Sequence, residues 1–388
     1  MAEVYLKRGE EQDIHEGHLW IYDNEIERTA GEFAQGDVVD VLAHGGAFLG
    51  RGYINQKSRI TVRLLTLRRE EIDRAFLKGR LEEAIGLRRS LGMKGACRLV
   101  FGEADALPAL IVDKFGDCLV IQTLALGMER MKGDIVSLLA ELLSPRCIYE
   151  RNDVPLREKE GLPQQKGLLF GAQPGIVEIE ENGLRILVDI ENGQKTGYFL
   201  DQSENRAAIA PFVHDAEVLD CFCHTGGFAL HAARYGAKEV EAVDISQDAL
   251  ELVRRNATLN GFENITATQA NVFDLLKNYQ AAGRSFGTVI LDPPAFAKNR
   301  AALAGAWRGY KEINLRGMRL TRPGGFLVTC SCSHFMTPEL FLKMLAEAAR
   351  DVGVRAKVVE QRFQAKDHPF SLTADESLYL KCVILQIL

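Results

Sequence analysis

The sequence predicts an α/β protein with an N-terminal β-barrel over residues 1–67, a middle α+β domain over 68–185 and a C-terminal Rossmann-like domain over 186–388. The first observation behind this prediction is length, because 388 residues exceed the size at which one hydrophobic core usually stops growing. The second is composition, since 47% hydrophobic and 26% charged residues are typical of globular domains. The third is a change of rhythm after Gly193, from short strands with turns to alternating strands and helices.

The first 67 residues contain short apolar stretches that turn residues separate. Val38 to Leu42 follows a Gly-Asp pair, and Gly45-Gly46 separates it from the stretch Phe48 to Ile54. Residues 60–65 then alternate apolar with polar side chains. Short strands joined by glycine turns predict a small β-barrel.

The middle segment mixes helical and strand-like patterns. Residues 71–91 carry apolar side chains at near-helical spacing, and Gly92 is a stop signal. Asn182-Gly183 stands between two alternating runs in residues 176–190, which is a strong hairpin signal. One further helix is expected at Met131 to Leu143. Further strands are expected at Leu107 to Val112, Cys118 to Leu124 and Cys147 to Glu150.

From Gly193 onward, strands and helices alternate, which predicts a mainly parallel sheet with helices on both faces. Ligands of such sheets lie at the carboxyl ends of the strands, where the strand order reverses. Residues that directly follow a strand are therefore the candidates for chemistry. The expected strands are Val218-Leu219, Val240 to Val243, Ile265 to Ala267, Thr288 to Leu291 and Gly325 to Thr329.

Charge and cysteine content narrow the classes of protein. The net charge of −6 argues against a general nucleic-acid coat, but residues 51–100 hold 13 Lys and Arg against 5 Asp and Glu. That segment either attracts phosphate or is a solvated face with interleaved Arg and Glu. With no apolar signal core and no membrane-spanning run, the eight cysteines predict cytosolic thiols and a cytoplasmic protein. The Cys-x-Cys pairs are too closely spaced for a usual zinc site, so no metal is expected.

A glycine-containing loop follows the first strand of the C-terminal domain. Its glycines, Gly226 and Gly227, let a ligand approach the backbone and leave helix N–H groups pointing at it. Asp244 ends the second strand, where a carboxylate can hold ribose hydroxyls, and Phe273 can lie against an adenine ring. Asp220 either contacts the cofactor or caps the turn. The remaining residues of the predicted cofactor site are Phe222, Ile245, Asn271 and Val272.

The segment Asp292-Pro293-Pro294-Ala295-Phe296 directly follows the fourth strand. It resembles the [Asp/Asn]-Pro-Pro-x-aromatic motif of class I methyltransferases, which implies S-adenosylmethionine as cofactor and Asp292 as a cofactor contact. A dehydrogenase would explain the glycine loop and Asp244, but it would not explain the two prolines. Two prolines alone could merely end a strand. Their place on the expected strand, with the loop and the acid upstream, favours the methyltransferase.

Two thiols, Cys330 and Cys332, lie at the end of the fifth strand. Carbon 5 of cytosine is a poor nucleophile until a group adds to carbon 6, and a cysteine thiolate is suited to that addition. The expected strand order places both thiols beside the Asp-Pro-Pro loop. The residues alone leave open whether either cysteine acts. A resemblance to cytosine methyltransferases, whose cysteine stands at the same distance from a Gly-Gly pair, implies Cys332 when counted from Gly324-Gly325.

Residues 324–334, with Asn192 to Gln202 and Arg308 to Asn314, resemble the bacterial 23S ribosomal RNA cytosine-5 methyltransferase family. The resemblance extends over essentially the whole chain. It implies that residues 1–67, including Gly17 to Tyr22, form a PUA domain, an RNA-binding β-barrel. It further implies formation of 5-methylcytosine in ribosomal RNA, and a homodimer.

By the same resemblance Cys332 is the nucleophile, and Phe199 and Gln202 are further cofactor contacts. Cys330 departs from the family, in which an aromatic residue often occupies that position. Asp292 is expected to accept a hydrogen bond from the cytosine edge or to protonate N3 as the adduct forms. The base that removes the C5 proton is unassigned, because Ala295 stands where another branch of cytosine-5 enzymes has a second cysteine.

The target base has to leave its stack to meet both the thiol and the methyl group, which is easiest in single-stranded or looped RNA. The residues expected to contact it or its RNA are Pro293, Pro294, Phe296, Lys298, Arg308, Tyr310 and Lys311. The last four are equally compatible with an exposed amphipathic helix.

Two other functions fit the same residues. An enzyme with an Asp-Pro-Pro-Phe motif can methylate an exocyclic amine of RNA or protein without any cysteine. A non-catalytic RNA-binding protein could retain the same fold. Covalent trapping with 5-fluorocytosine RNA distinguishes the first alternative, and binding of S-adenosylmethionine distinguishes the second.

Overall fold

The computed structural model describes residues 1–297, 299–373 and 377–388. It divides into two compact units, and the chain passes between them several times. Unit 1 comprises Met1–Ile179, Val188–Leu200 and Lys366–Ser377. Unit 2 comprises Glu180–Leu187, Asp201–Ala365 and Leu378–Leu388. The division into three domains with borders after residues 67 and 185 stays a prediction.

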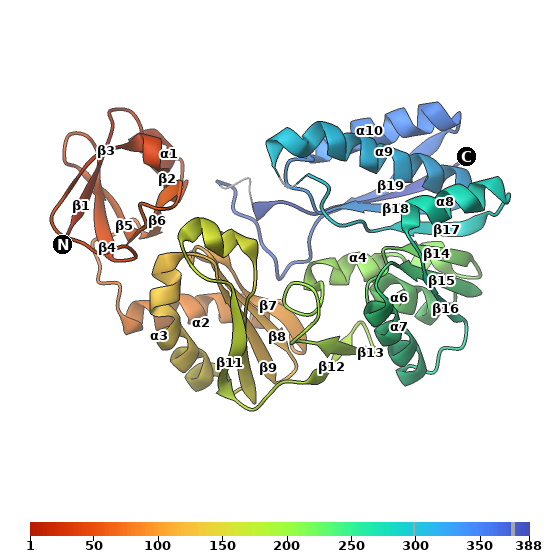
Figure 1. Ribbon diagram of the computed structural model, residues 1–388, viewed down its shortest axis with the longest axis horizontal. Coiled ribbons are helices and arrows are strands. Elements are labelled where there is room, and N and C mark those ends of the chain that lie inside the picture. The colour runs from red at the N-terminus through yellow and green to blue at the C-terminus, as the bar shows by residue number, and fades with distance from the viewer. Residues whose placement is uncertain (298, 374–376) are drawn as a thin grey trace. The chain divides into compact units, whose positions relative to one another are not determined.

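Unit 1 begins with a six-stranded sheet in the order β2-β6-β5-β4-β1-β3 (Figure 1). Val41, Ile54 and Leu64 are completely buried in its core, as the short apolar runs predict. A Cβ atom at Gly52 would lie 2.1 Å from the carbonyl oxygen of Arg63, so the close pairing of β5 and β6 requires glycine there. The elements are β1 (Glu3–Leu6), α1 (Glu11–His15), β2 (Trp20–Tyr22), β3 (Ile26–Ala30), β4 (Val38–Leu42), β5 (Phe48–Ile54) and β6 (Ile60–Thr66).

A second sheet of unit 1 has the order β11-β10-β9-β8-β7, and two long helices pack against it. The helix predicted over residues 71–91 is α2 (Arg74–Ser90), and the side chain of Asp73 caps it by accepting from the Phe76 N–H. The predicted strands and the second helix are confirmed within a few residues. These elements are β7 (Ala96–Phe101), β8 (Leu110–Phe115), β9 (Cys118–Thr123), α3 (Leu126–Leu143), β10 (Cys147–Asn152) and β11 (Gln165–Gly171).

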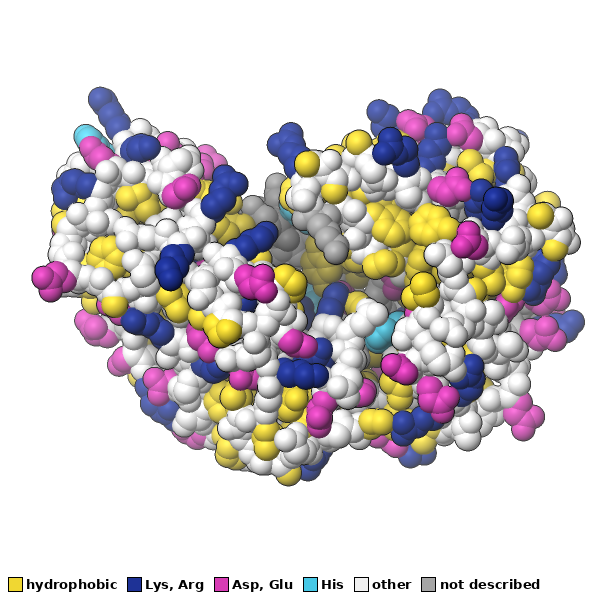
Figure 2. Space-filling view, in the orientation of Figure 1, with side chains coloured by type: hydrophobic (Ala, Val, Ile, Leu, Met, Phe, Trp, Pro, Cys, Tyr) yellow, Lys and Arg dark blue, Asp and Glu magenta, His cyan; other side chains and the backbone are white. Residues whose placement is uncertain are grey.

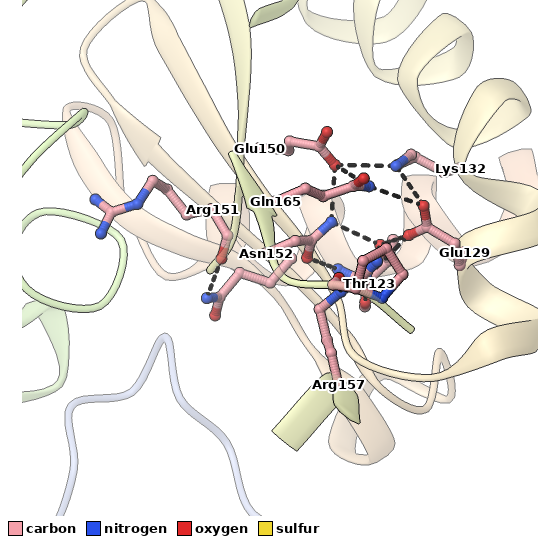
Figure 3. A network of polar contacts seen from close by, with 10 residues as sticks. Thr123, Glu129, Lys132, Glu150, Arg151, Asn152, Arg157 and Gln165 are labelled. Atoms are coloured by element: carbon pink, nitrogen blue, oxygen red, sulfur yellow. Dashed lines mark hydrogen bonds and ion pairs between the residues drawn. The ribbon is translucent and has the colours of Figure 1, made fainter. Parts of the chain in front are cut away.

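A network of charged and polar side chains connects α3 with β9, β10 and β11 (Figure 3). Glu129 accepts hydrogen bonds from Lys132 at 2.6 Å and from Arg157 at 2.9 Å. Lys132 also donates to Glu150 at 2.9 Å. Burial raises the pKa of Glu129, but the hydrogen bonds around it, the one from Lys132 foremost, outweigh burial and hold its pKa below the ordinary value. These charges therefore compensate one another within the fold.

The basic residues of the segment 51–100 are mostly paired. Eight of its thirteen Lys and Arg side chains form ion pairs with carboxylates among the described residues. Several are buried pairs, such as Arg63 with Glu160 at 3.0 Å. Figure 2 likewise shows positive and negative side chains interspersed over the face that it displays. The pairing favours the interpretation of this segment as an internally compensated surface over that of a phosphate-binding patch.

Unit 2 contains a seven-stranded sheet in the order β16-β15-β14-β17-β18-β20-β19, in which the first five strands are parallel. The strand order reverses beside β14, between β15 and β17, as expected for a doubly wound sheet. All five predicted parallel strands are confirmed. The strands are β14 (Glu217–Cys221), β15 (Glu239–Asp244), β16 (Ile265–Gln269), β17 (Phe286–Leu291), β18 (Thr321–Ser331), β19 (Ala356–Arg362) and β20 (Lys381–Ile387).

Two hydrophobic clusters cover the two faces of this sheet (Figure 1). Neighbouring residues of one strand, such as Leu219 and Val218 in β14, belong to opposite clusters because side chains alternate along a strand. One cluster packs against α8, α9 and α10, and the other against α5, α6 and α7. The helices are α4 (Ser203–Ala208), α5 (Ala210–Val213), α6 (Gly227–Arg234), α7 (Gln247–Leu259), α8 (Val272–Ala281), α9 (Leu303–Leu320) and α10 (Pro338–Val352).

The predicted hairpin around Asn182-Gly183 is formed by β12 (Ile176–Glu181) and β13 (Leu184–Asp189). Both turn residues have positive φ, which Asn and Gly adopt most readily. No helix in the described part of the chain is long and apolar enough to cross a membrane.

Candidate active site

The loop after β14 is a tight turn with an unusual backbone. Phe222 and His224 have φ of 63° and 49°, values that side chains other than glycine seldom adopt. Gly226 has φ of 86°, and a Cβ atom there would lie 3.2 Å from Val253. Gly227 then begins α6, so the first N–H groups of the helix are at the carboxyl edge of the sheet. The geometry is that of a loop built for close approach of a ligand.

Asp220 is completely buried behind this loop. Its Oδ2 accepts a hydrogen bond from the Ala229 N–H at 2.9 Å, so the carboxylate caps the first turn of α6. Its Oδ1 is buried and has no hydrogen-bond partner among the described residues. Burial first and then the charge of Asp292 raise the pKa of Asp220 well above its ordinary value. The Asp220 side chain thus caps α6 through Oδ2. Its Oδ1 can accept a further hydrogen bond.

Asp244 lies at the end of β15 with a fixed carboxylate. Its two oxygens accept from the N–H groups of His224 and Ser246, each at 2.9 Å. Ile245 follows with an exposed fraction of 68%, which is unusual for so apolar a side chain. An oriented carboxylate next to an exposed apolar side chain suits the ribose and the base of a nucleoside.

The third strand leads into α8, where three predicted cofactor residues follow one another. The Asn271 side chain caps the helix by accepting from the Phe273 N–H at 2.9 Å. Val272 is buried in the hydrophobic cluster, so its side chain does not reach a ligand, and a contact would have to use its backbone. The Phe273 ring lies 6.5 Å from the ring of Phe222 and 6.1 Å from that of Phe296. These rings form an aromatic group at the sheet edge.

Tyr310 was expected to contact RNA, and the structure corrects this expectation. Its side chain is fully buried, with its ring 4.6 Å from that of Phe296 and 5.9 Å from that of Phe341. Its hydroxyl is 2.9 Å from Ser333 Oγ, which also accepts from the Ala297 N–H. Tyr310 faces inward because it lies on the apolar side of α9, and it braces the loop after β17 against the end of β18.

The Asp292 carboxylate ends a chain of hydrogen bonds. Gln202 Nε2 donates to Asp292 Oδ1 at 2.9 Å, and Asn205 donates to Gln202 Oε1 at 2.7 Å. Arg362 in turn donates to Asn205 Oδ1 at 3.1 Å. Gln202 and Asn205 are buried, so the carboxylate is held in one orientation. The sequence predicted Gln202 as a cofactor contact, and the structure gives it a contact with Asp292.

Cys332 is half-buried, and its Sγ lies 3.8 Å from the carbonyl oxygen of Pro293. The other seven cysteines of the chain are buried. Cys330 pairs with Cys382 across β18 and β20, and burial foremost raises its pKa well above the ordinary value. A buried thiol with a raised pKa is a poor nucleophile, which counts against the Cys330 alternative. Cys332 and the Asp-Pro-Pro loop therefore meet at the carboxyl edge of the sheet.

The other residues that are predicted to contact RNA or the cofactor differ in their exposure and in their partners. Pro293 is buried, Pro294 is exposed, and Arg308 is exposed on α9. Lys311 forms ion pairs with Asp351 at 2.8 Å and with Glu347 at 3.5 Å, so its charge is already compensated. Lys298 lies outside the described residues. Phe199 belongs to unit 1, where the Lys195 ammonium lies 4.5 Å from its ring centroid.

His231 in α6 supports the cofactor loop from behind and leads to a prediction about pH. Its Nδ1 is 2.7 Å from the Gly227 carbonyl oxygen, and its Nε2 is 3.0 Å from the Asn182 amide nitrogen. This arrangement requires a neutral ring that donates from Nδ1 and accepts at Nε2. Burial foremost lowers the pKa of His231 from 6.5 to about 4.

Between pH 6.5 and pH 4, His231 is protonated in the unfolded chain but stays neutral in the folded chain. The contribution of His231 to the free energy of unfolding is therefore complete above pH 6.5 and decreases as the pH falls toward 4. We expect the wild type to lose about 2 kcal/mol of unfolding free energy through this group between about pH 7.5 and about pH 5. Urea denaturation of the wild type and of His231→Gln at both pH values measures the difference. Equal losses in the two proteins would show that His231 does not contribute.

Sequence reasoning missed two residues that the structure places beside Cys332. Ser333 Oγ bonds both the Tyr310 hydroxyl and the Ala297 N–H. Lys381 is buried at the start of β20, and its ammonium group contacts the Ser333 carbonyl. The one available signal was a lysine at the head of the apolar run Cys382 to Leu385. A charge at the border of a buried strand is a reason to look for a functional site.

Comparison with known proteins agrees with this architecture. Residues 4–67 match the model of a PUA-like domain, and residues 166–378 match that of an S-adenosylmethionine-dependent methyltransferase. The chain is 43% identical to a protein of Shewanella amazonensis and 44% identical to one of Shewanella denitrificans, each called ribosomal RNA large subunit methyltransferase I. Each alignment covers 99% of this chain and 99% of the relative.

Two solved structures share the fold over the whole length of both chains. One is described as a methyltransferase complexed with SAH, with a TM-score of 0.86 and 19% identity. The other is described as a SAM-dependent methyltransferase from Streptococcus mutans, with a TM-score of 0.84 and 19% identity. The chain therefore belongs to the family of the ribosomal RNA large subunit methyltransferase I proteins, and it combines a PUA-like domain with an S-adenosylmethionine-dependent methyltransferase domain.

Proposed function

We propose that the protein transfers the methyl group of S-adenosylmethionine to carbon 5 of a cytosine in large-subunit ribosomal RNA, with Cys332 as the nucleophile. The observation that carries this proposal is the meeting of the half-buried Cys332 thiol with the Asp-Pro-Pro loop, at 3.8 Å from the Pro293 carbonyl. The names of the relatives support ribosomal RNA as the substrate. The PUA-like domain supports a role in RNA binding.

The residues at the sheet edge fit S-adenosylmethionine. Asp220 Oδ1 is a buried acceptor without a partner among the described residues, so a polar group of a ligand would satisfy it. The oriented carboxylate of Asp244 suits two ribose hydroxyls, and Phe273 with the exposed Ile245 suits the adenine ring. When bound, the cofactor supplies an electrophilic methyl group.

The protein's own residues then act on the cytosine. Cys332 Sγ adds to carbon 6, which makes carbon 5 electron-rich and able to accept the methyl group. Asp292, held by Gln202 at 2.9 Å, acts in its carboxylic acid form and gives its proton to N3 as negative charge develops there. Water then takes the C5 proton, the electron pair of the broken C–H bond forms the C5–C6 double bond, and the Cys332 thiolate leaves, which restores the aromatic ring. Pro294 and Phe296 shape the loop on which the flipped base would lie.

Covalent trapping tests this proposal. We expect the wild type to form a denaturation-stable adduct with an RNA that contains 5-fluorocytosine, because fluorine at carbon 5 cannot leave as a proton would. Cys332→Ala should form none, whereas Cys330→Ala should still form it. A methylated RNA without any adduct would contradict the thiol route and would favour an exocyclic amine as the acceptor. Mass-spectrometric mapping of ribosomal RNA from a deletion strain would identify the nucleotide.

Two further parts of the proposal concern the protein in the cell. A ribosomal RNA substrate supports a cytoplasmic location for the enzyme, and cell fractionation tests it. A homodimer is inferred from the resemblance of the whole chain to its family. Light scattering after size-exclusion chromatography would measure the mass, and a 43 kDa species alone would contradict the dimer.

A further inference from the structure

Lys381 is a buried lysine beside the proposed nucleophile. It begins β20 and has an exposed fraction of 1%. In the antiparallel register with β18 it lies opposite Ser331, one residue before Cys332. Its Nζ donates to the Ser333 carbonyl oxygen at 2.6 Å and to the Tyr379 carbonyl oxygen at 2.8 Å. The amine is therefore fixed between the backbone of Ser333, the residue that follows Cys332, and the backbone of Tyr379, two residues before Lys381.

No carboxylate among the described residues forms an ion pair with Lys381, which is unusual for a buried lysine. The two carbonyl oxygens occupy two of the three N–H positions of an ammonium group. Burial lowers the pKa of Lys381 to about 8, and Cys332 is the group whose charge counteracts this by raising it. At neutral pH the amine is thus mostly protonated, and the charge of Cys332 favours this protonated form.

The other titratable groups around this pair come from several elements. Asp292 belongs to the loop after β17, and Tyr310 on α9 bonds Ser333 Oγ. Asp201 accepts a hydrogen bond from the Tyr379 hydroxyl at 2.5 Å. Cys330 and Cys382 lie side by side in the sheet, and His334 follows Ser333. Among these groups, the negative charges of Asp292 and Asp201 oppose a thiolate at Cys332, so a nearby cation is needed to favour the thiolate.

We propose that Lys381 is a positioning residue that activates Cys332, because its ammonium group stabilises the thiolate while its hydrogen bond to the Ser333 carbonyl holds the Ser-Cys-Ser segment in place. In the activating step the S–H bond of Cys332 breaks, its electron pair stays on sulfur, and the proton passes to water. The ammonium group remains protonated and balances the thiolate charge. The inference rests on the proposed function, in which that thiolate adds to carbon 6.

A purely structural role would use the same two hydrogen bonds, so the test has to report on the thiol itself. The rate of Cys332 alkylation by iodoacetamide is measured against pH in the full-length protein without RNA, and peptide mass spectrometry follows the Cys332 peptide alone. Lys381→Met keeps the length of the side chain and removes the charge. Lys381→Arg keeps the charge.

We expect Lys381→Met to move the midpoint of alkylation upward by about one pH unit or more, and Lys381→Arg to stay close to the wild type. An unchanged midpoint in a folded Lys381→Met protein would overturn the inference. If that variant fails to fold, the wild type decides: a Cys332 midpoint at or above the ordinary value of about 8.5 overturns the inference, and a lower one supports it. Failure of the 5-fluorocytosine adduct would count against the proposed function alone, whatever the alkylation midpoint.

Discussion

Replacing Cys332 by alanine is expected to reduce methyl transfer to RNA by about 10⁴-fold or more, because the variant loses the group that makes carbon 5 reactive. The substitution removes one sulfur from a half-buried position, so little packing is lost. The carboxylates of Asp220 and Asp244 are held by backbone N–H groups of α6 and of the loops after β14 and β15, away from the Cys332 segment in the chain. The affinity for S-adenosylmethionine should therefore stay within about twofold of the wild type.

Cys330→Ala is the matched control for this experiment. Cys330 lies in β18, two residues before Cys332, but is completely buried beside Cys382. We expect this variant to keep most of its methyl transfer rate and to lose some stability from the small cavity. Single-turnover methylation with tritiated cofactor and calorimetry of cofactor binding measure both quantities. If Cys332→Ala methylated RNA at close to the wild-type rate while Cys330→Ala was inactive, Cys330 and not Cys332 would be the nucleophile.

The parallel sheet and its carboxyl edge could be predicted because they depend on local patterns. Strands such as β17 are mostly apolar, since both of their faces are buried, and the motif that starts at Asp292 directly follows. Chain topology then brings Asp220, Asp244 and Asp292 to one edge, whatever the details of packing. Family resemblance added the role of Cys332, which the residues alone left open between two thiols.

The features that could not be predicted depend on tertiary contacts. Tyr310 carries a polar atom, and only the packing of α9 against Phe296 and Phe341 reveals that it is buried. The partner of Lys381 is 48 residues away in sequence, at the Ser333 carbonyl, and no spacing indicates it. The excess of basic residues in 51–100 is compatible with phosphate binding when that segment is considered alone. In the fold, carboxylates from other segments, such as Asp40 and Glu160, neutralise these basic side chains. Composition gives the number of charged residues but not which of them form ion pairs.

Asp292→Asn is expected to lower the rate of methyl transfer by about 10²- to 10⁴-fold, the usual range for a lost proton-transfer or charge-stabilising group. The amide has nearly the same size, and its oxygen can still accept the hydrogen bond that Gln202 donates at 2.9 Å. What disappears is the negative charge and the ability to exchange a proton with N3 of the cytosine. The loss should therefore appear in kcat more than in KM.

Stability separates this catalytic role from a structural one. The Asp292 charge helps to raise the pKa of the buried Asp220, which means that the two carboxylates repel each other in the folded protein. Removing that charge should leave the melting temperature unchanged or raise it, whereas a residue that only held the loop would lower it when replaced. Gln202→Ala is the control, because it retains the carboxylate but releases its orientation, and we expect a loss of about tenfold. A fully active Asp292→Asn would exclude the carboxylate from the chemistry and leave Cys332 as the sole reacting side chain.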